Sequence, residues 1–540
     1  MMNLDSSWDL IVIGGGISGA GIFREAVRMG LKSLLLEQQD FAWGTSSRSS
    51  KLVHGGLRYL KEGRFFLTRD AVRERERLLV EARGLVTPIG FLVPVYKDRG
   101  PGRWTLEAGL SIYDLIAKRR QHDYLDAETF VNQAPNIDRK GLVGGFQFFD
   151  AQVDDARLVL RLIFEGMANG GTALNYVRVA AVGRNKDGRV NGVTVEEVHA
   201  HQTLSLKTKA VINATGCWAE RLHPSPQKNR HLRPLRGSHL IFPAPVLPVD
   251  QAISTIHPAD GRAFFVAPWE GAVIAGTTDL DHQNSLSAEP RITEDEVAYL
   301  LDGLHAMFPA LDVSARDCIA TIAGVRPVLS EGKCEPSEES REHVVWVDNG
   351  LVTVTGGKLT TFRKLAFDAL KAAKPFLPTD TTTDEGSPVF QPFKSQPVSP
   401  SPLADSHWER LNGRYGDSAE TIVTGTSPSD FAIIPGTQTM WAEILHAAAH
   451  EKIHHLSDLL LRRVRVGLLT AEGGREHLSR IRHLCEPVLG WNSNRWKKEI
   501  RDYQEIWRFA HGMPGHFARS RGRLKSFFFN VGKRLRKHFA

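Results

Sequence analysis

The sequence has few cysteines, and those it has lie far apart. The 540-residue chain contains four, and none forms a C-x-x-C pair: Cys217, Cys318, Cys334 and Cys485. This spacing excludes a disulfide scaffold and a cysteine-rich zinc site, and it is typical of a reducing compartment. The N-terminus lacks the basic and apolar regions of a secretory signal, and no apolar run reaches the roughly 18 residues of a membrane-spanning helix. We therefore expect a cytoplasmic protein.

The chain also lacks a positive charge spread over its whole surface. Its net charge is +7, but eight Lys or Arg and no acid lie between Arg519 and Ala540. Subtracting that tail (7 − 8) leaves the rest of the chain near −1. This distribution argues against nucleic acid as a partner. The length and the 42% hydrophobic content are those of a globular chain of about two to four domains.

Strands and helices alternate along much of the chain. A short apolar run at Asp9–Ile13 is followed by glycines, a helical pattern at Ile17–Met29 and a second apolar strand at Ser33–Leu36. This order is that of one βαβ unit. Further strands are expected at Lys209–Asn213, Ala272–Ala275 and Leu351–Thr355. The fold class is therefore mixed α/β.

A proline-rich segment divides the chain. Seven prolines lie between Pro375 and Pro402, among Thr, Ser and Asp. This composition opposes regular structure, and it predicts a linker at residues 376–405. The linker separates a body at residues 1–375 from a helix-rich C-terminal domain at 406–510, and a basic tail follows at 511–540.

A glycine-rich turn joins the first strand to its helix. In Gly14-x-Gly16-x-x-Gly19, the glycines permit a tight turn, close approach of a pyrophosphate and close packing of helix and strand. Glu37 ends the second strand, where an acid binds a ribose hydroxyl. We interpret the unit as a dinucleotide site. An acid at position 37 disfavours NADP, but the motif leaves NAD and FAD as alternatives.

Six segments, in order, resemble the flavin-dependent (aerobic, respiratory) glycerol-3-phosphate dehydrogenases. They are TSSRSSKLVHGGLRYL (45–60), VINATG (211–216), RGSH (236–239), AGVRP (323–327), GGKLTTFRK (356–364) and LLLRR (459–463). The resemblance covers about residues 8–510. It implies non-covalent FAD, oxidation of sn-glycerol 3-phosphate to dihydroxyacetone phosphate, and delivery of electrons to membrane quinone. It also implies a body of the D-amino-acid-oxidase type, in which a substrate domain is inserted into a Rossmann-like FAD-binding domain, and a C-terminal helical cap domain.

The cofactor-binding residues follow from the glycine-rich turn and from the resembling segments. We expect them at Gly14, Gly15, Gly16, Ser18, Gly19, Glu37, Thr45, Ser46, Ser50, Lys51, Leu52, His54, Gly55, Gly56, Ala214, Thr215, Gly216, Gly357, Lys358, Leu359 and Thr360. One residue departs from the family pattern. Arg48 stands where we expect a small residue, and it would add a positive charge near the flavin.

The substrate carries a phosphate dianion, and cations are needed to bind it. The resemblance supplies Arg58, Arg326 and Lys358. Lys358 precedes a helix expected to begin near Leu359, whose positive end would stabilise a reduced, anionic flavin. Tyr59 is either a substrate-binding residue or a core aromatic. Two threonines next to the lysine, at positions 360 and 361, could equally cap the helix.

The general base is either His239, in the RGSH segment, or His54, in VHGG. Histidine suits the task because its ordinary pKa of about 6.5 lies near working pH. Either residue could instead only hydrogen-bond the flavin or the substrate. We place His239 first. With Arg326 and Lys358, these histidines complete the predicted catalytic set.

Three histidines near the C-terminus have the spacing of one helix face. His446, His450 and His454 recur every four residues, which is also a spacing of metal ligands. No carboxylate motif accompanies them. We therefore expect no metal site here.

The basic tail carries an apolar stripe at helical spacing. It consists of Leu524, Phe527, Phe528, Val531, Leu535 and Phe539, and Lys and Arg flank it. Such a helix suits the surface of an anionic bilayer, and it predicts a peripheral protein on the inner face of the cell membrane. The alternatives are a disordered basic tail and a helix packed on the body. The sequence leaves open whether the protein forms a homodimer.

Other functions fit the same fold. An oxidase or dehydrogenase of an amino acid or amine would need fewer cations, and direct oxidation of glycerol 3-phosphate by oxygen is a closer alternative. A non-catalytic, FAD-stabilised membrane-associated protein would have no need to hold Arg58, Arg326, Lys358 and His239.

Overall fold

The predicted βαβ unit lies at the centre of the first of two large sheets. A computed structural model describes residues 4–57, 63, 65–223, 231–330, 332, 339, 342–378, 384–392 and 403–515. The first sheet has the spatial order β17 (His343–Asp348), β18 (Leu351–Gly356), β10 (Thr203–Asn213), β1 (Ser7–Ile13), β2 (Ser33–Leu36) and β7 (Thr172–Leu174). The antiparallel strands β8 (Val177–Arg184) and β9 (Val190–Glu197) extend from β10.

The parallel register of this sheet positions the site. Ile13, the last residue of β1, is level with Asn213 of β10 and Leu36 of β2. The carboxyl ends of these strands therefore meet at one edge, where open α/β sheets bind their ligands. Helix α1 (Ile17–Arg28) packs against both α6 (Asp155–Ala168) and α9 (Phe362–Ala373), and the apolar residues of all three share one core with Leu10 and Val12 of β1.

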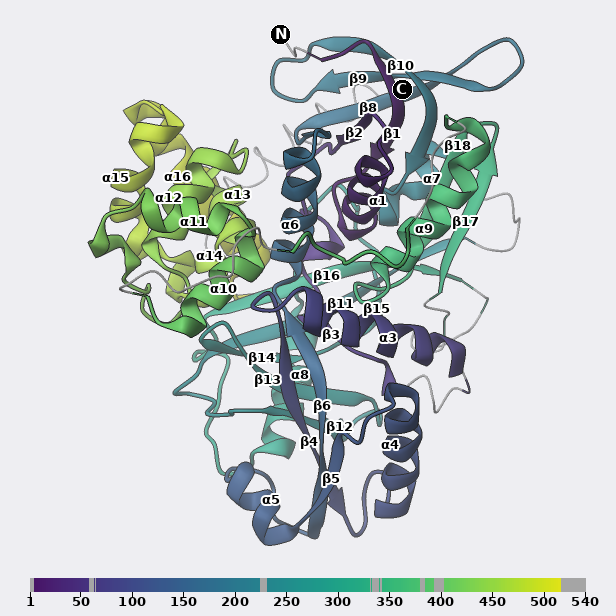
Figure 1. Ribbon diagram of the computed structural model, residues 1–540. Coiled ribbons are helices and arrows are strands. Elements are labelled where there is room, and N and C mark those ends of the chain that lie inside the picture. Colours follow the sequence, from purple (N-terminus) through teal and green to yellow (C-terminus); the bar gives the residue numbers. More distant parts are fainter. Residues whose placement is uncertain are drawn as a thin grey trace.

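The second sheet lies below the first in Figure 1 and is mostly antiparallel. Its spatial order is β15 (Leu280–Asp281), β11 (Leu232–Pro243), β14 (Ala272–Gly276), β13 (Ala263–Trp269), β12 (Ala252–Ile256), β4 (Val86–Tyr96), β6 (Leu142–Val153) and β3 (Leu52–Val53). Two further strands pair with β11 and β6 respectively: β16 (Ala320–Leu329) and β5 (His122–Asp126). Four helices accompany this sheet: α3 (Phe65–Glu81), α4 (Arg103–Ala117), α5 (Ala127–Gln133) and α8 (Glu294–Met307).

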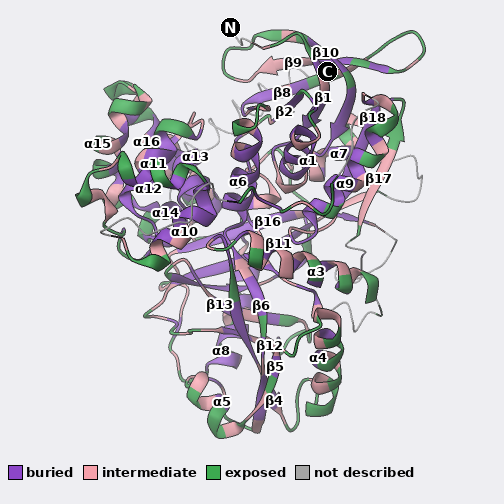
Figure 2. Cartoon of the chain, viewed as in Figure 1, coloured by how far each residue is buried: buried purple, intermediate pink, exposed green. Residues whose placement is uncertain are grey.

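The C-terminal part is helical, as predicted, and lies to one side of both sheets (Figure 1). Its helices are α10 (Asp405–Tyr415), α11 (Ser418–Thr424), α12 (Trp441–His450), α13 (Leu456–Asp458), the π-helix η6 (Leu459–Arg463), α14 (Val466–Leu469), α15 (Leu478–Leu489) and α16 (Ser493–His511). Leu460 and Trp496 of this part share a core with Trp269 and Ile322 of the second sheet. Figure 2 shows buried residues where the helices meet the sheets. The helical domain is therefore packed on the body.

Part of the predicted linker is anchored on the first sheet's layer of helices. Val389 and Phe390 are buried in the core that surrounds α1, and the backbone N–H of Val389 donates to Glu81 at 2.5 Å. The described range that contains this anchor is 384–392.

The predicted elements agree with the structure in type and place. β1, α1 and β2 occur where the βαβ unit was predicted, and β10, β14 and β18 contain the three further predicted strands. The fold class, mixed α/β with a C-terminal helical domain, is confirmed. Among the described residues, no helix is both long enough and apolar enough to cross a bilayer. The apolar stripe of the tail lies outside the described residues, which end at 515.

Candidate cofactor and substrate site

The glycine-rich turn is held at the carboxyl edge of the first sheet. The N–H of Gly14 donates to Leu36 O at 2.8 Å, and the N–H of Gly15 donates to Glu37 Oε2 at 2.7 Å. Burial raises the pKa of Glu37, although the N–H groups of Gly15 and Gln39 favour its charged form. The glycine turn and the acid predicted to bind ribose are therefore next to each other.

Two glycines of the turn differ in their surroundings. A Cβ atom on Gly19 would lie 1.9 Å from Gly14 O, so only glycine lets α1 pack this close to the turn. Gly16 has φ −85° and ψ −175°, which any residue adopts, and a Cβ there would meet only Ser46, at 3.1 Å from Oγ. The protein itself thus leaves room at Gly16. This cradle, at the positive N-terminus of α1, fits a pyrophosphate.

The segment with the TSSRSSK sequence lies over the start of α1. Ser46 is in the short 3-10 helix η1 (Thr45–Ser47), and its Oγ accepts a hydrogen bond from Ile17 N at 2.9 Å. Thr45 Oγ1 donates to Val325 O of β16 at 2.5 Å. The segment therefore connects the first residue of α1 to the second sheet, where the predicted substrate residues lie.

Lys51, predicted to bind the cofactor, directs its ammonium group into the protein. Nζ donates to Asp155 at 2.8 Å and to Ser47 O at 2.8 Å, and the side chain is fully buried. Burial lowers the pKa of Lys51 to about 8, against the opposing charge of Asp155. Asp155 also accepts from Ser49 N at 2.9 Å and forms an ion pair with Arg465 of the helical domain. The ammonium of Lys51 thus braces the segment that carries Ser46 and Ser50.

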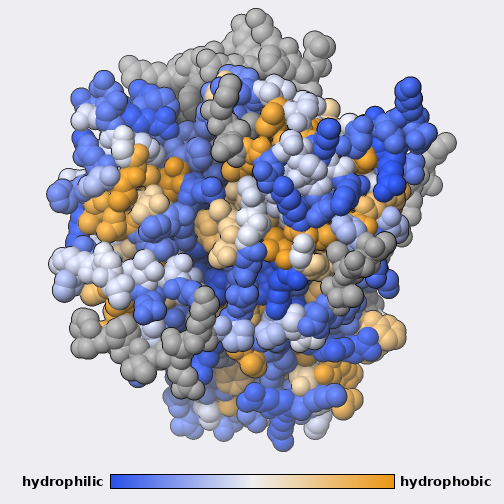
Figure 3. Space-filling model, turned by 45° about the horizontal axis from the view of Figure 1, so that its top comes forward, coloured by the Kyte–Doolittle hydropathy of each residue, from blue (hydrophilic) through white to orange (hydrophobic). Residues whose placement is uncertain are grey.

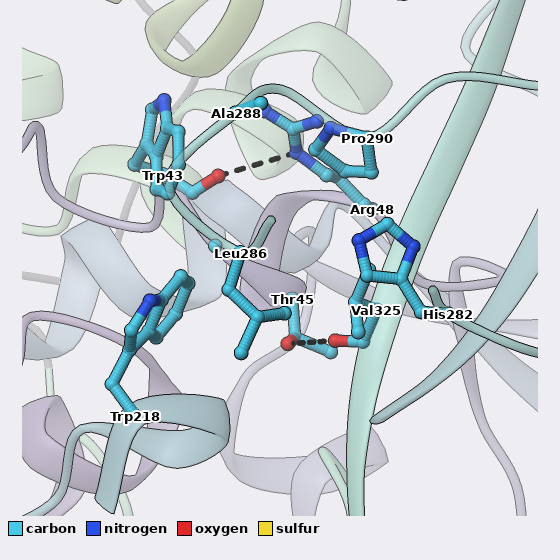
Figure 4. Close-up of a pocket in the computed structure, with 10 residues that line it drawn as sticks. Trp43, Thr45, Arg48, Trp218, His282, Leu286, Ala288, Pro290 and Val325 are labelled. Atoms are coloured by element: carbon cyan, nitrogen blue, oxygen red, sulfur yellow. Dashed lines mark hydrogen bonds between the residues drawn. The ribbon is translucent and has the colours of Figure 1, made fainter. Parts of the chain in front are cut away.

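Arg48 has a carboxylate partner. Its guanidinium pairs with Glu289. Its Nε donates to Trp43 O at 3.2 Å, a hydrogen bond that Figure 4 shows as a dashed line. Burial raises the pKa of Glu289, but the charge and hydrogen bond of Arg48 outweigh it and hold that pKa below its ordinary value. The positive charge predicted near the flavin is therefore neutralised by Glu289. The pair adjoins a small cavity of about 20 Å³ whose lining includes Trp43, Trp218 and His282.

The VINATG segment meets the glycine turn at the sheet edge. Ala214 N donates to Ile13 O at 2.9 Å, and a Cβ on Gly14 would lie 2.6 Å from Ala214 O. Thr215 Oγ1 donates to Asn213 Oδ1 at 2.7 Å, and Thr355 Oγ1 donates to Gly216 O at 3.0 Å. Two segments predicted to bind the cofactor are therefore in contact.

His239 lies on β11, at the point where the second sheet approaches the TSSRSSK segment. Its Nε2 is 2.9 Å from Ser50 Oγ, whereas its Nδ1 has no hydrogen-bond partner among the described residues. Burial, together with the positive charges of Lys51 and Arg326, lowers the pKa of His239 to about 3. The imidazole is therefore neutral at neutral pH. A neutral imidazole is the form that can accept a proton.

Arg326 lies on β16 and is oriented by a buried acid. Its Nη2 donates to Asp279 Oδ1 at 2.5 Å, and the Asp279 side chain is 1% exposed while that of Arg326 is 30% exposed. Arg262 reaches the other oxygen of Asp279 at 3.2 Å. Because one end of Arg326 is fixed and the side chain is partly open, it can present N–H donors to an anion.

Lys358 lies in the turn between β18 and α9. The helix begins at Phe362, three residues later than the predicted start near Leu359, because residues 357–361 form the turn. Thr361 occupies the N-cap position, but its side chain makes no capping hydrogen bond, so the structure does not support the alternative that these threonines cap the helix through their side chains. Thr360 Oγ1 instead donates to His54 O at 3.3 Å, which brings the second candidate base beside the turn that carries the lysine.

Two predicted substrate residues, Arg58 and Tyr59, lie outside the described residues. Leu52 is in β3, and the N–H of Gly55 donates to Asp150 Oδ1 at 3.2 Å. Burial raises the pKa of Asp150 to about 6, despite the opposing charge of Arg75.

The three histidines near the C-terminus do not share one helix face. The rings of His446 and His450 lie 4.9 Å apart on α12, but that helix ends at His450. His454 lies beyond the end and stacks on His199 at 5.6 Å. The expectation of a common face is therefore wrong, because the helix stops before its third member.

Sequence reasoning missed the acids that organise the site. Asp279 follows β14 in a GTTD sequence, Asp155 is in QVDDA, and Glu289 is in an otherwise irregular loop. Acids two or three residues after the end of a strand, as in the first two cases, are a usable signal for a positioning role. Glu289 has no such signal, since only the fold brings it to Arg48.

Comparison with known proteins gives two family matches. Residues 9–363 match the family described as "FAD dependent oxidoreductase", and residues 379–496 match the "C-terminal domain of alpha-glycerophosphate oxidase". An aerobic glycerol-3-phosphate dehydrogenase from Staphylococcus epidermidis is 32% identical over 85% of this chain and 87% of its own. One of the same name from Bacillus subtilis is 36% identical over 78% of this chain and 76% of its own.

A solved structure has the same fold. It is the glycerol-3-phosphate dehydrogenase from Bacillus halodurans complexed with FAD. The TM-score is 0.71, with 23% identity, and the match covers 94% of this chain and 95% of that one. The likeness therefore includes both the sheets and the helical domain.

Proposed function

The chain belongs to the FAD dependent oxidoreductase family, and from this premise we propose that it oxidises sn-glycerol 3-phosphate to dihydroxyacetone phosphate and passes the electrons to membrane quinone. The observation that carries the reaction is the match to aerobic glycerol-3-phosphate dehydrogenases over most of both chains. The described site supports it with a neutral, buried His239 and an oriented cation, Arg326.

The residues at the sheet edge fit FAD. The open cradle at Gly16 and the N-terminus of α1 suit the pyrophosphate, and Glu37 suits the ribose. We assign the remaining contacts to Ser46, Ser50 and the turn at Lys358. When bound, FAD supplies the flavin that accepts the hydride.

The charges of the site suit a phosphorylated substrate. Arg326, fixed by Asp279, binds the phosphate through charge-assisted hydrogen bonds, together with Lys358 and Arg58. An amino acid has one carboxylate and would need fewer cations. The number of cations at the site therefore favours glycerol 3-phosphate over the amino-acid or amine alternative.

His239 is the general base of the proposal. Its neutral imidazole accepts the proton of the C2 hydroxyl as the hydride leaves C2. Ser50 bonds Nε2, so Nδ1 is the nitrogen that can receive the proton without breaking that contact. The positive charges of Lys51 and Arg326 destabilise the imidazolium, so they favour release of the proton from the ring.

Oxygen is a second candidate acceptor. The match of residues 379–496 to the C-terminal domain of alpha-glycerophosphate oxidase favours it, because an oxidase passes electrons to oxygen. The acceptors are told apart by measuring oxygen consumption and quinone reduction with the same preparation.

Membrane attachment through the basic tail, on the inner face of the cell membrane, remains part of the proposal. A quinone dissolved in the bilayer makes such attachment useful. The composition of residues 519–540 supports it. A homodimer is a further assembly to test by sedimentation.

The deciding experiment is anaerobic mixing of the purified protein with substrates while the flavin absorbance is followed. We expect glycerol 3-phosphate to bleach the flavin, and glycerol, glycine and proline to leave it oxidised. Bleaching by an amino acid but not by glycerol 3-phosphate would replace the proposal. No bleaching by any substrate, in a protein that dithionite still reduces, would favour a non-catalytic flavoprotein.

A further inference from the structure

One buried carboxylate lies behind the strand that carries the proposed base. Glu296 is the third residue of α8, which packs against β11 and β14, and it is 2% exposed. Hydrophilic side chains cover much of the molecular face shown in Figure 3, where they are open to solvent. A buried carboxylate has no such solvation, so partners inside the protein must satisfy it.

The two oxygens of Glu296 have different partners. Oε2 accepts a hydrogen bond from Thr293 N at 2.9 Å, and Thr293 Oγ1 accepts from Glu296 N at 3.3 Å, which is a capping box. Oε1 accepts from Ser238 Oγ at 2.8 Å and from Thr278 Oγ1 at 2.8 Å. Arg236 donates to Oε1 from Nε at 3.3 Å, and its Nη2 lies 2.9 Å from Oε2. Helix capping therefore explains a contact of Oε2 but none of those of Oε1.

The partners of Oε1 belong to two segments of the proposed substrate site. Ser238 directly precedes His239 on β11. Thr278 directly precedes Asp279, the acid that pairs with Arg326. The two segments also bond each other, because Ser238 N donates to Thr278 Oγ1 at 2.9 Å and Thr278 N donates to Ser238 O at 3.3 Å. One carboxylate oxygen thus joins the segment of the base to the segment that orients the phosphate-binding cation.

The base and the cation lie on the face of the second sheet that is opposite to Glu296. Side chains alternate along a strand, so His239 and Gly237 of β11 point away from the face where Glu296 binds. The strand register places Arg326 of β16 on the same face as His239. A Cβ atom on Gly237 would lie 3.4 Å from Arg326 Nη2, so the guanidinium passes over this glycine, two residues from the base. The spacing of the two groups therefore depends on how β11 and the turn after β14 are held together.

We propose that Glu296 is a positioning residue that fixes the spacing between His239 and Arg326, and that this spacing selects the length of the substrate. The inference rests on the proposed function, in which the C2 hydroxyl meets His239 while the phosphate of the same molecule meets Arg326. Reaction rates of bound molecules depend steeply on position, and a misplacement of about 1 Å can cost on the order of 10²-fold in rate. Because Glu296 lies behind the sheet, it acts through its hydrogen-bond partners.

The test uses substitutions that alter the contacts of Oε1 and change the side-chain volume little. Thr278→Val replaces the hydroxyl by a methyl group and removes one hydrogen bond to Glu296. Thr278→Ser keeps the hydroxyl and should behave as the parent protein does. Glu296→Gln keeps the shape of the side chain but removes the charge that pairs with Arg236. Glu294→Gln, the same change at an exposed position of the same helical turn, is the matched control.

The measurement is reduction of the flavin in the holoprotein by two phosphate esters. One is glycerol 3-phosphate, and the other is butane-1,2,4-triol 4-phosphate, which has one more methylene between the reacting carbon and the phosphate. We expect the parent protein to prefer glycerol 3-phosphate by at least about tenfold, the usual cost of one surplus methylene in a fitted site.

Both test variants should lose speed and selectivity together. In Thr278→Val and in Glu296→Gln, the reduction rate at saturating glycerol 3-phosphate should fall by about 10-fold to 10²-fold, and the preference over the longer ester should fall at least about fivefold. Thr278→Ser and Glu294→Gln should keep the preference of the parent protein. General damage to the protein would lower both rates equally and would leave the preference unchanged.

A binding measurement separates this inference from the proposed function. Inorganic phosphate needs no reaction, and its affinity for the holoprotein, measured by calorimetry, reports on Arg326. Thr278→Val should bind it about threefold to tenfold more weakly than the parent protein, the cost of one neutral hydrogen bond. Thr278→Ser should bind it normally. If the parent protein binds phosphate but neither ester reduces its flavin, the proposed function fails, and the phosphate affinities of these variants decide the inference.

Three results would overturn the inference. One is an unchanged preference between the two esters in both Thr278→Val and Glu296→Gln. Another is equal phosphate affinity in Thr278→Val and the parent protein, or no phosphate binding by either. A third is a loss of preference in Thr278→Ser as large as that in Thr278→Val, which would show that the hydroxyl is not the cause. If Glu296→Gln does not fold, Thr278→Val decides, since it leaves the ion pair with Arg236 in place.

Discussion

His239 Nε2 lies 2.9 Å from Ser50 Oγ, although the two residues are 189 positions apart in the chain. The contact joins β11 of the second sheet to the segment that covers the N-terminus of α1. Lys51, next to Ser50, lowers the pKa of the same imidazole through its charge. Burial is the larger cause of the lowered pKa, and the predicted flavin-binding segment adds to it through the charge of Lys51.

The first prediction concerns this base. His239→Gln should slow reduction of the flavin by glycerol 3-phosphate by roughly 10²–10⁴, because the C2 proton loses its acceptor. Substrate affinity should change much less. Ser50→Ala, which removes only the hydrogen bond to Nε2, should have a smaller effect. Stopped-flow reduction at several substrate concentrations separates the two quantities, and a normal rate in His239→Gln would move the role to His54 or solvent.

The second prediction concerns the phosphate. Arg326→Ala should weaken use of glycerol 3-phosphate by at least about tenfold, because a hydrogen bond to a charged group contributes about 1.5–3 kcal/mol. Asp279→Asn should have a part of this effect, since Asp279 orients the guanidinium. Arg233→Ala removes an arginine of β11 that pairs with Asp281 and serves as the control. Plain glycerol should be a very poor substrate, and equal kcat/KM for both alcohols would contradict the phosphate role.

The third prediction separates ligand binding from folding. Gly16→Val should abolish FAD binding, because the side chain would occupy the cradle of the pyrophosphate. Gly102→Val is a matched control: it also precedes a helix with an extended backbone, at φ −67°, and a Cβ there meets nothing within 4 Å. The measurement is FAD released on acid denaturation. If the Gly16→Val protein is still yellow, the pyrophosphate does not bind at this turn.

The fourth prediction concerns pH. The pKa of His239 is about 3 in the folded protein and about 6.5 when unfolded, so below pH 6.5 only the unfolded chain takes up this proton. The stabilising contribution is complete above pH 6.5 and is lost as pH falls, by about 2 kcal/mol between pH 6.5 and 5. His239→Gln should therefore lose less stability than the parent protein over this range. Urea unfolding at each pH measures the free energy of unfolding of both proteins. If this free energy changes equally with pH in the parent protein and in His239→Gln, the pKa of His239 is not lowered by folding.

The fifth prediction concerns the junction with the helical domain. Asp155 forms ion pairs with Lys51 and Arg465 and accepts a hydrogen bond from the N–H of Ser49. Asp155→Ala would leave two buried cations without this partner and should cost about 3–5 kcal/mol of stability. It should also loosen FAD, because the segment with Ser46 and Ser50 loses its brace. Arg69→Ala, which changes an exposed arginine, is the control. If the thermal midpoint of Asp155→Ala agrees within error with that of the parent protein, Asp155 does not have this stabilising role.

Much of the fold could be predicted because it rests on local rules. The strand at Asp9–Ile13, the helix from Ile17 and the strand ending at Leu36 follow from hydrophobic periodicity and from glycines where a tight turn requires them. The arrangement of the dinucleotide motif was predictable for the same reason. Its turn, helix start and terminal acid lie within one short stretch, so their spacing alone places them together.

Tertiary structure alone decided how the distant residues combine. Lys51 lies in a segment predicted to bind the cofactor, yet its ammonium turns to Asp155, because a buried cation needs an acid and α6 brings one. Arg48 pairs with Glu289, 241 positions away, and Arg326 pairs with Asp279. Local sequence determines which elements form, through sterics and periodicity that act over a few residues. Which charges meet depends on how those elements pack, because burial requires each charge to find a partner wherever the fold places one.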